Sequence, residues 1–262
     1  MKKTILLYLF TFLTIASFAQ VLKKEFKGNL LTTDQFSNYY EVFDNQIKKY
    51  NIKGELLFTY SNNVLGEITS LDVRNPLKIL VYFNEFTKVL TLDDALSPWG
   101  DVLNLNDLSL EETSLVCTSY NYGVWYYNPL KYILTRIQNQ KITNTSSNIS
   151  TLLDINIQPN YLVEENEKVY LNDPVNGILV FDVFGTYLKT IPLYHLNEFH
   201  VKEKFILYVN EQKQIETYDF FTLEKQVYQP EIYKNIKTVR LQGKHIFILN
   251  ENNELIIDKI AL

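Results

Sequence analysis

The sequence predicts an all-β protein, a six-bladed β-propeller whose last blade is completed by the N-terminal strand. Three observations lead to this fold class. A short phrase recurs six times, an apolar strand and a polar turn precede each copy, and the chain ends one strand short of the pattern. Helical periodicity is nowhere sustained, and repeats of this length are typical of radial or solenoid β-architectures.

The recurring phrase is an aliphatic residue, two variable residues, an aromatic residue or Leu, and then Asp or Asn. Its final Asp or Asn residues lie 42, 35, 54, 37 and 39 positions apart, which indicates one insertion after the third copy. The copies are Ile47–Asn51, Val89–Asp93, Val124–Asn128, Ile178–Asp182, Ile215–Asp219 and a shortened sixth, Leu255–Asp258.

Each copy follows an apolar strand and a turn rich in Asn, Asp and Gly, residues that tolerate the positive φ of hairpin turns. Each unit is therefore predicted to hold a hairpin with the phrase as its second strand. A further strand usually follows the phrase, and a shorter one precedes the hairpin, which gives four strands a unit. The shorter strands are predicted at residues 67–72, 150–155, 198–201 and 237–242.

A ring arrangement follows from burial. A four-stranded sheet that is apolar on both faces needs a neighbour on each side, and closing the ring removes the two unpaired ends. The last unit holds three strands, and the alternating segment at residues 21–28, VLKKEFKG, is predicted to supply the fourth.

Other all-β folds remain open at this point. They are a ring of five or seven blades, a pair of β-sandwiches, and an open β-array. The run from Pro98 to Thr113 is hard to divide between the second and third units.

The first nineteen residues are predicted to be a signal peptide and residues 20–262 a single propeller domain. Lys2 and Lys3 precede an apolar run, and Ser17-Phe18-Ala19 places small residues at the cleavage-site spacing. The run is too short for the alternative, a transmembrane anchor. We therefore expect an exported chain, located in the periplasm or peripheral to the outer membrane.

Composition excludes several partner classes. Removing the signal takes away two Lys and no acidic residue, so the formal net charge falls from −5 to −7. This charge argues against nucleic-acid binding and against anionic membrane surfaces. Cys117 is the only cysteine, so no intrachain disulfide is possible, and its apolar surroundings predict a buried core residue.

The phrasing and the strand pattern over nearly the whole mature chain resemble the six-bladed propeller group that includes NHL-like and WD40-like modules, in a divergent form. The sequence lacks the Gly-His and Trp-Asp marks of WD40 repeats, so the resemblance is one of architecture. Together with the export signal and the acidic, Asn- and Tyr-rich composition, the chain is similar to the small periplasmic propellers of bacteria with a type 9 secretion system. One role in that group is the plug subunit of the outer-membrane translocon.

The sequence offers little chemistry for catalysis. No nucleophile elbow, phosphate loop, HExxH pattern or sialidase-type turn appears. His195 and His200 are offset by five residues, which on a strand points them to opposite faces, and a third ligand is lacking. We expect no catalytic, metal or cofactor-binding residues, although carboxylates gathered from distant blades around the channel stay possible.

Aromatic residues make up 14% of the chain, and most fall on strands at core spacing. Trp99, Trp125 and Tyr126 are the candidate partner contacts, since exposed aromatic residues on a rigid rim suit binding. Alternation sends Tyr126 to the face opposite Trp125 and Tyr127. The polar segment at residues 139–150 is expected to be a mobile loop that accounts for the long interval.

The function expected from these features is that of a non-catalytic protein-binding subunit or scaffold in the cell envelope, plugging or gating a secretion translocon at its periplasmic face. The alternative is a glycan-binding or glycan-cleaving periplasmic propeller, which should carry two carboxylates and an aromatic residue facing one mouth of the channel.

Overall fold

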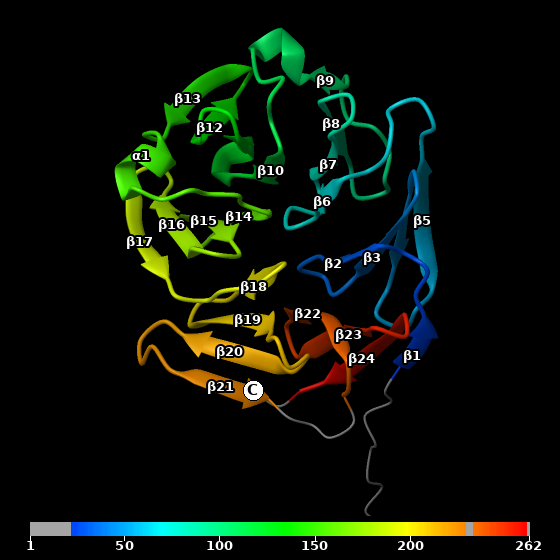
Figure 1. The fold of residues 1–262 in the computed structure, drawn as a ribbon. Helices are drawn as coiled ribbons and strands as arrows, with labels where there is room; N and C mark the ends of the chain where they lie inside the picture. Colours follow the sequence, from blue (N-terminus) through cyan, green and yellow to red (C-terminus); the bar gives the residue numbers. More distant parts are fainter. Residues whose placement is uncertain (1–21, 229–232, 261–262) are drawn as a thin grey trace, which may run out of the picture.

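The computed structural model describes residues 22–228 and 233–260. These residues form six four-stranded antiparallel sheets arranged in a ring, which confirms the predicted six-bladed β-propeller (Figure 1). The predicted signal peptide, residues 1–19, lies outside the described part. Within that part, no helix has the length and apolar character needed to cross a membrane.

The first three blades follow one another along the chain, and each is a meander of four strands. Blade 2 has the shortest outer strand and continues into a 3-10 turn, η1. Their elements are β2 (Leu30–Thr33), β3 (Tyr39–Phe43), β4 (Gln46–Tyr50) and β5 (Leu56–Ser61); β6 (Ser70–Asp72), β7 (Ile79–Phe83), β8 (Lys88–Leu92), β9 (Leu103–Asn104) and η1 (Leu105–Leu108); β10 (Leu115–Thr118), η2 (Tyr120–Tyr122), β11 (Val124–Asn128), β12 (Ile133–Gln138) and β13 (Lys141–Thr145).

A one-turn helix leads into the second half of the ring. The sixth blade takes its outer strand from the start of the described chain. The elements are α1 (Ile149–Leu153); β14 (Tyr161–Glu165), β15 (Lys168–Asp173), β16 (Gly177–Asp182) and β17 (Tyr187–Ile191); β18 (Phe199–Val201), β19 (Phe205–Val209), β20 (Ile215–Asp219) and β21 (Lys225–Tyr228); β22 (Ile236–Gln242), β23 (His245–Asn250), β24 (Glu254–Lys259) and β1 (Leu22–Glu25).

The ring is closed by the pairing of the two chain ends, as the sequence predicted. Strand β1 runs antiparallel to β24, with Leu22 opposite Ile257 and Glu25 opposite Glu254. The backbone N–H of Phe26 extends the ladder by donating to the carbonyl of Asn253 at 2.8 Å. The buried Phe26 ring then leads the chain into blade 1.

The core is divided into six clusters, each lying between two neighbouring blades. Strand alternation produces this division, because successive side chains point to opposite faces of a sheet. Tyr126 packs toward blade 2, whereas Trp125 and Tyr127 pack toward blade 4, as predicted. Both faces of every blade are thus covered, which explains why the strands read as nearly continuous apolar runs.

The recurring phrase is explained by its last residue. The Asp182 carboxylate accepts hydrogen bonds from the backbone N–H groups of Phe184 and Thr186, at 2.9 and 2.8 Å. This turn, in which an Asp or Asn side chain caps the backbone that follows, ends a strand and reverses the chain. The phrase-ending residues that accept such bonds are Asn51, Asp93, Asn128, Asp182 and Asp219.

Blade 3 differs from the prediction. Its phrase is the second strand, β11, whereas the phrase is the third strand in the other blades. Residues 139–150 were expected to be a mobile loop, but they hold the turn into β13, that strand itself and the start of α1. The 54-residue interval therefore reflects an earlier position of the phrase within its blade. Residues 150–155 were predicted as a strand and form most of α1; the inner strand of blade 4 is β14.

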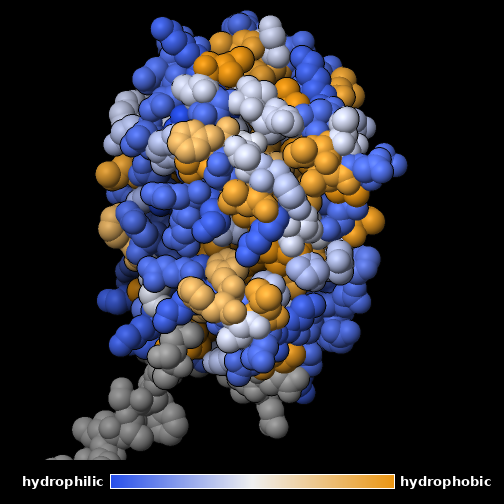
Figure 2. All heavy atoms as spheres, turned by 90° about the vertical axis from the view of Figure 1, so that its left-hand side faces the viewer, coloured by the Kyte–Doolittle hydropathy of each residue, from blue (hydrophilic) through white to orange (hydrophobic). Residues whose placement is uncertain are grey.

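The side of the outer wall that carries β17 is polar with scattered apolar islands. Figure 2 shows this side, where apolar residues form separate groups among hydrophilic ones. Small separate groups of this kind are normal for a soluble surface. The recognition features of the molecule are therefore better sought at the ends of the ring.

Candidate functional site

A groove of about 900 Å³ lies at one end of the ring, between blades 2 and 3 and reaching blade 4. Neighbouring strands in a meander run in opposite directions. The connections after the first and third strands of each blade therefore gather at the same end. The groove is built from five of these connections, namely residues 73–78, 93–102, 119–123, 139–140 and 166–167.

Aromatic side chains and cations alternate along the groove. Tyr122 is 65% exposed, and Trp99 is 55% exposed. The Lys78 ammonium lies 5.0 Å from the centre of the Tyr122 ring and 5.7 Å from that of Trp99. Deeper in, the Arg136 guanidinium covers the Tyr120 ring at 4.1 Å. Such cation–π contacts stabilise the positions of the rings at the surface.

The connection that carries both tyrosines is tightly constrained. Asn121 and Tyr122 have φ values of 50° and 60°, in the left-handed region that costs a non-glycine residue free energy. Arg136 anchors the loop by donating to the Tyr120 carbonyl at 2.6 Å. A Cβ at Gly123 would lie 2.5 Å from the same guanidinium, so a larger residue there would displace Arg136. The loop from Ser119 to Gly123 has a strained backbone and carries the exposed Tyr122 ring, so it is a candidate functional element.

A buried carboxylate fixes the loop from below. Glu164, on β14 of blade 4, accepts from the backbone N–H of Tyr120 at 2.8 Å and from the Trp125 indole N–H at 2.7 Å. The Ser119 hydroxyl donates to the same carboxylate. These three charge-assisted bonds compensate the cost of burying the group and tie blade 3 to blade 4.

A second carboxylate ties blade 2 to blade 3. Asp72 accepts from the Thr118 backbone N–H and hydroxyl, both at 2.8 Å, and pairs with Arg74. Burial acts to raise the pKa of Asp72, but the Arg74 guanidinium and the Arg74 and Thr118 hydrogen bonds outweigh it and lower the pKa to about 2. Arg74 in turn donates to the Thr118 carbonyl at 2.9 Å.

This pKa predicts a pH dependence of stability. Because the pKa is lower in the folded state than the ordinary 3.8, ionised Asp72 stabilises the fold above about pH 4, and this is lost as the pH falls toward 2. The expected loss is about 2 kcal/mol. Urea unfolding between pH 6 and pH 2 measures it, with Asp72→Asn as the comparison. Equal pH profiles of the two proteins would contradict the assignment.

The three aromatic residues predicted as partner contacts have different positions. Trp99 is exposed in the connection after β8, beside Lys78, which lines the groove. Trp125 and Tyr126 are 0% and 2% exposed and belong to core clusters, and Tyr126 also lines the groove. Burial leaves these two rings almost no surface for a partner, because both faces of a blade are covered. The groove-lining residues that the sequence did not reveal include Lys78, Tyr120, Tyr122 and Glu164, and the buried Arg136 supports the Tyr120 ring.

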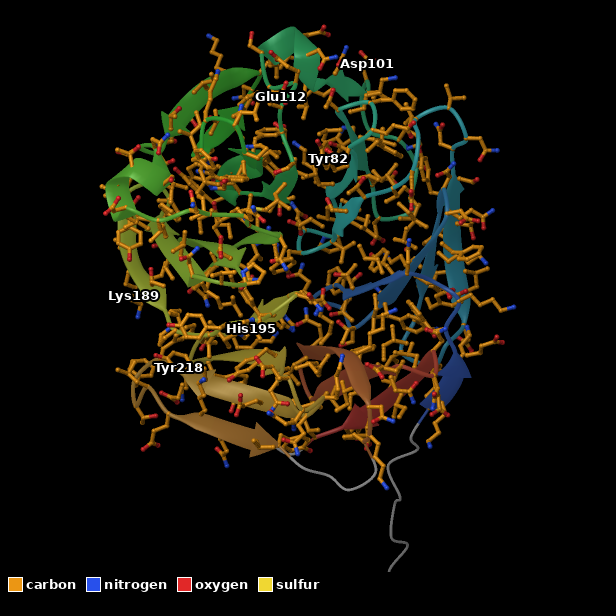
Figure 3. All side chains as sticks on the ribbon, in the orientation of Figure 1. Tyr82, Asp101, Glu112, Lys189, His195 and Tyr218 are labelled. Atoms are coloured by element: carbon orange, nitrogen blue, oxygen red, sulfur yellow. The ribbon has the colours of Figure 1, made fainter. Side chains whose placement is uncertain are left out.

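The histidines do not converge. His195 is exposed, with its Nε2 3.7 Å from the Glu211 carboxylate, in the connection between blades 4 and 5 (Figure 3). His200 lies on β18, where its Nδ1 accepts the Leu241 backbone N–H at 3.0 Å. Burial, aided by nearby cations, lowers the pKa of His200 well below its ordinary value. Within residues 22–228 and 233–260, no group of three His, Cys, Asp or Glu side chains could hold a metal ion.

Cys117 is buried between blades 3 and 4, and burial raises the pKa of its thiol. We expect the folded protein to resist modification by a thiol reagent at pH 8, since a buried, protonated thiol is a poor nucleophile. The unfolded chain should react at once. The absorbance of the coloured product that the reagent releases measures the reaction of the folded protein in buffer and of the unfolded chain in denaturant. Fast reaction in buffer would contradict the burial.

The fold and the groove define the class of this protein as a six-bladed β-propeller. No family model matches the sequence, and no curated protein is significantly similar to it. Solved structures are similar at low identity. A catalytically inactive virginiamycin B lyase from Staphylococcus aureus, crystallised with quinupristin, matches over 92% of this chain and 100% of that chain, with a TM-score of 0.62 and 10% identity.

Two further structures are similar, a WD40 β-propeller domain and a protein in complex with a partner. The WD40 β-propeller domain of Doa1 matches over 88% of this chain and 78% of that chain, with a TM-score of 0.58 and 12% identity. BBS1N in complex with ARL6DN matches over 88% and 77%, with a TM-score of 0.54 and 12% identity. Identities this low show a common fold and do not carry function over.

Proposed function

We propose that the chain is an exported, non-catalytic protein-binding subunit of the cell envelope. The propeller fold commonly mediates protein binding, and its neighbours include BBS1N, crystallised with ARL6DN. The observation that carries the proposal is the groove between blades 2 and 3, where exposed aromatic rings stand on a strained, anchored loop. Rigid exposed aromatic side chains are the residues that dominate the binding energy of protein interfaces.

The non-catalytic part of the proposal rests on how the polar groups are used. Glu164 and Asp72, the enclosed carboxylates of the groove region, are each engaged by three or more donors. Cys117 is buried. Groups that already accept several hydrogen bonds hold the structure together and are poorly placed to act as general acids or bases.

The partner that we propose is an outer-membrane protein-secretion translocon of the type 9 system, whose periplasmic mouth the propeller plugs or gates. This step is supported by sequence features, namely the export signal at residues 1–19, the acidic charge and the size of the domain. A closed ring has a shape suited to covering an opening (Figure 1).

The test is affinity capture from envelopes solubilised in mild detergent, with the tagged protein expressed in its own host. We expect a membrane-derived protein complex to be retained, and we expect Trp99→Ala with Tyr122→Ala to reduce that retention. Phe221→Ala, an exposed ring in blade 5, is the matched control. Retention of no envelope protein would refute the proposal, as would a mature chain that still carries residues 1–19.

The alternative function, glycan binding or cleavage, has weaker support. The groove offers aromatic rings and the carboxylates of Asp101, Glu165 and Glu167, but Glu164, its most enclosed carboxylate, already accepts three hydrogen bonds and is poorly placed to act as a general acid. A pair of carboxylates available for acid and base roles is what glycoside cleavage needs. Capture of polysaccharide in the same experiment, without protein, would favour this alternative.

A further inference from the structure

The free charges of the groove are mainly negative. Asp101, Glu165 and Glu167 lie along it, and none of them is within ion-pair distance of a basic group among the described residues. Arg74 is neutralised by its pair with Asp72. Lys78 is thus the one groove-lining cation without a carboxylate partner in the described part of the chain. The surplus matches the formal net charge of −5 for the whole chain.

The groove also already holds a cation between aromatic rings. The ammonium of Lys78 lies between Trp99 and Tyr122, both of which are more than half exposed. Aromatic faces attract ammonium and guanidinium groups, and nearby carboxylates add to that attraction. The outer faces of these rings and the three free carboxylates therefore offer positions for further cations.

We infer that this groove binds an extended segment of a partner protein rich in Lys or Arg. The cations of the segment lie against the Tyr120, Tyr122 and Trp99 rings and pair with Asp101, Glu165 and Glu167. The inference deepens the proposed function and depends on it, since it names the chemistry of the partner at the same surface.

Charge decides against an acidic segment. Three free carboxylates would repel it, and a single lysine would attract it. Arg136 offers little compensation, because it is 1% exposed and the Glu164 carboxylate lies next to it across the shared Ser119 hydroxyl. Like charges placed together at an interface act against binding, and opposite charges guide association.

The probe is a short fluorescent peptide of alternating Lys and Ser, with a Glu-for-Lys peptide as its counterpart, both measured by fluorescence anisotropy. We expect the purified protein to bind the Lys peptide and not the Glu peptide, with affinity falling as salt screens the charges. The double variant Glu165→Gln/Glu167→Gln is expected to weaken binding about tenfold, the scale of one or two lost charge pairs.

The matched control is Glu111→Gln/Glu112→Gln, which changes the net charge by the same amount. These exposed residues precede β10, in the connection after the fourth strand of blade 2, and strand alternation puts that connection at the end of the ring opposite the groove. Binding that falls equally in both double variants would show a non-specific charge effect and overturn the inference.

Lys78 gives a test of opposite sign. Lys78→Gln removes the cation that competes for the rings, so we expect it to strengthen binding of the Lys peptide. An acid-binding groove would show the reverse, because Lys78 would then be its ligand. Weaker binding by Lys78→Gln, or tight binding of the Glu peptide, would overturn the inference.

The outcome is separable from that of the proposed function. If envelope capture recovers a protein complex equally with the wild type and Glu165→Gln/Glu167→Gln, the protein-binding role stands and the groove inference fails. If the Lys peptide binds as expected and no envelope protein is captured, the envelope role fails while the groove chemistry stands.

Discussion

Replacing Phe26 with alanine is expected to reduce the free energy of unfolding by about 3–5 kcal/mol, the usual cost of removing a buried phenylalanine ring. The ring lies in the core cluster between blades 6 and 1, with Tyr39 and Phe247. It is 2% exposed and directly follows β1, the strand that closes the ring. A cavity here weakens the contact between the two chain ends as well as the core.

Urea unfolding followed by tryptophan fluorescence measures the change. The midpoint should fall while the slope stays the same, because the surface exposed on unfolding is unchanged. Phe36→Ala is the matched control, since that ring is 62% exposed in the same blade and should change stability by no more than about 0.5 kcal/mol. Equal effects of the two substitutions would show that the ring closure does not depend on the contact at Phe26.

The ring and its closure could be predicted from the sequence because both depend on local signals. Each phrase combines a strand with the capping Asp or Asn that ends it, and both are encoded within about five residues. The position of a strand within its blade cannot be predicted from such local signals. In blade 3 the capping Asn128 ends the second strand, and only pairing with β12 and β13 shows this.

The helix α1 shows a second limit of local patterns. Residues 150–155 hold apolar residues in a spacing that fits a short strand. They form a helical turn instead, because the Asn148 side chain accepts the Thr151 N–H at 2.8 Å and caps the helix. Apolar runs of this length are ambiguous by periodicity alone.

The groove could be predicted only in part. Trp99 follows Pro98 in a turn, and a turn position indicates exposure. The sequence predicts Trp125 as a partner contact as well. It lies on a strand whose two faces are covered by neighbouring blades, so its ring is buried. The contact between Trp125 and Glu164 joins residues 39 positions apart, so no local pattern could reveal it.

Replacing Glu164 with alanine is expected to cost about 3 kcal/mol or more of unfolding free energy, because three donors lose their acceptor at once. The Trp125 indole N–H, in a ring that is 0% exposed, is the most costly of them to leave without a partner. Glu164→Gln keeps one carbonyl oxygen as acceptor and should be less damaging. Urea unfolding ranks the variants by stability. Glu167→Ala, which changes an exposed residue in the turn after β14, is the near-neutral control.

The same substitution links the fold to the groove. Without Glu164 the Tyr120 N–H loses its anchor, and the left-handed Tyr122 beside it has less structure to hold it in place. Glu164→Ala should therefore weaken groove binding even where most molecules remain folded, and Trp125 emission should shift as water reaches the indole. If Glu164→Ala behaved like Glu111→Ala, which changes an exposed carboxylate outside the groove, in both measurements, the buried carboxylate would not be what positions the Tyr120–Tyr122 loop.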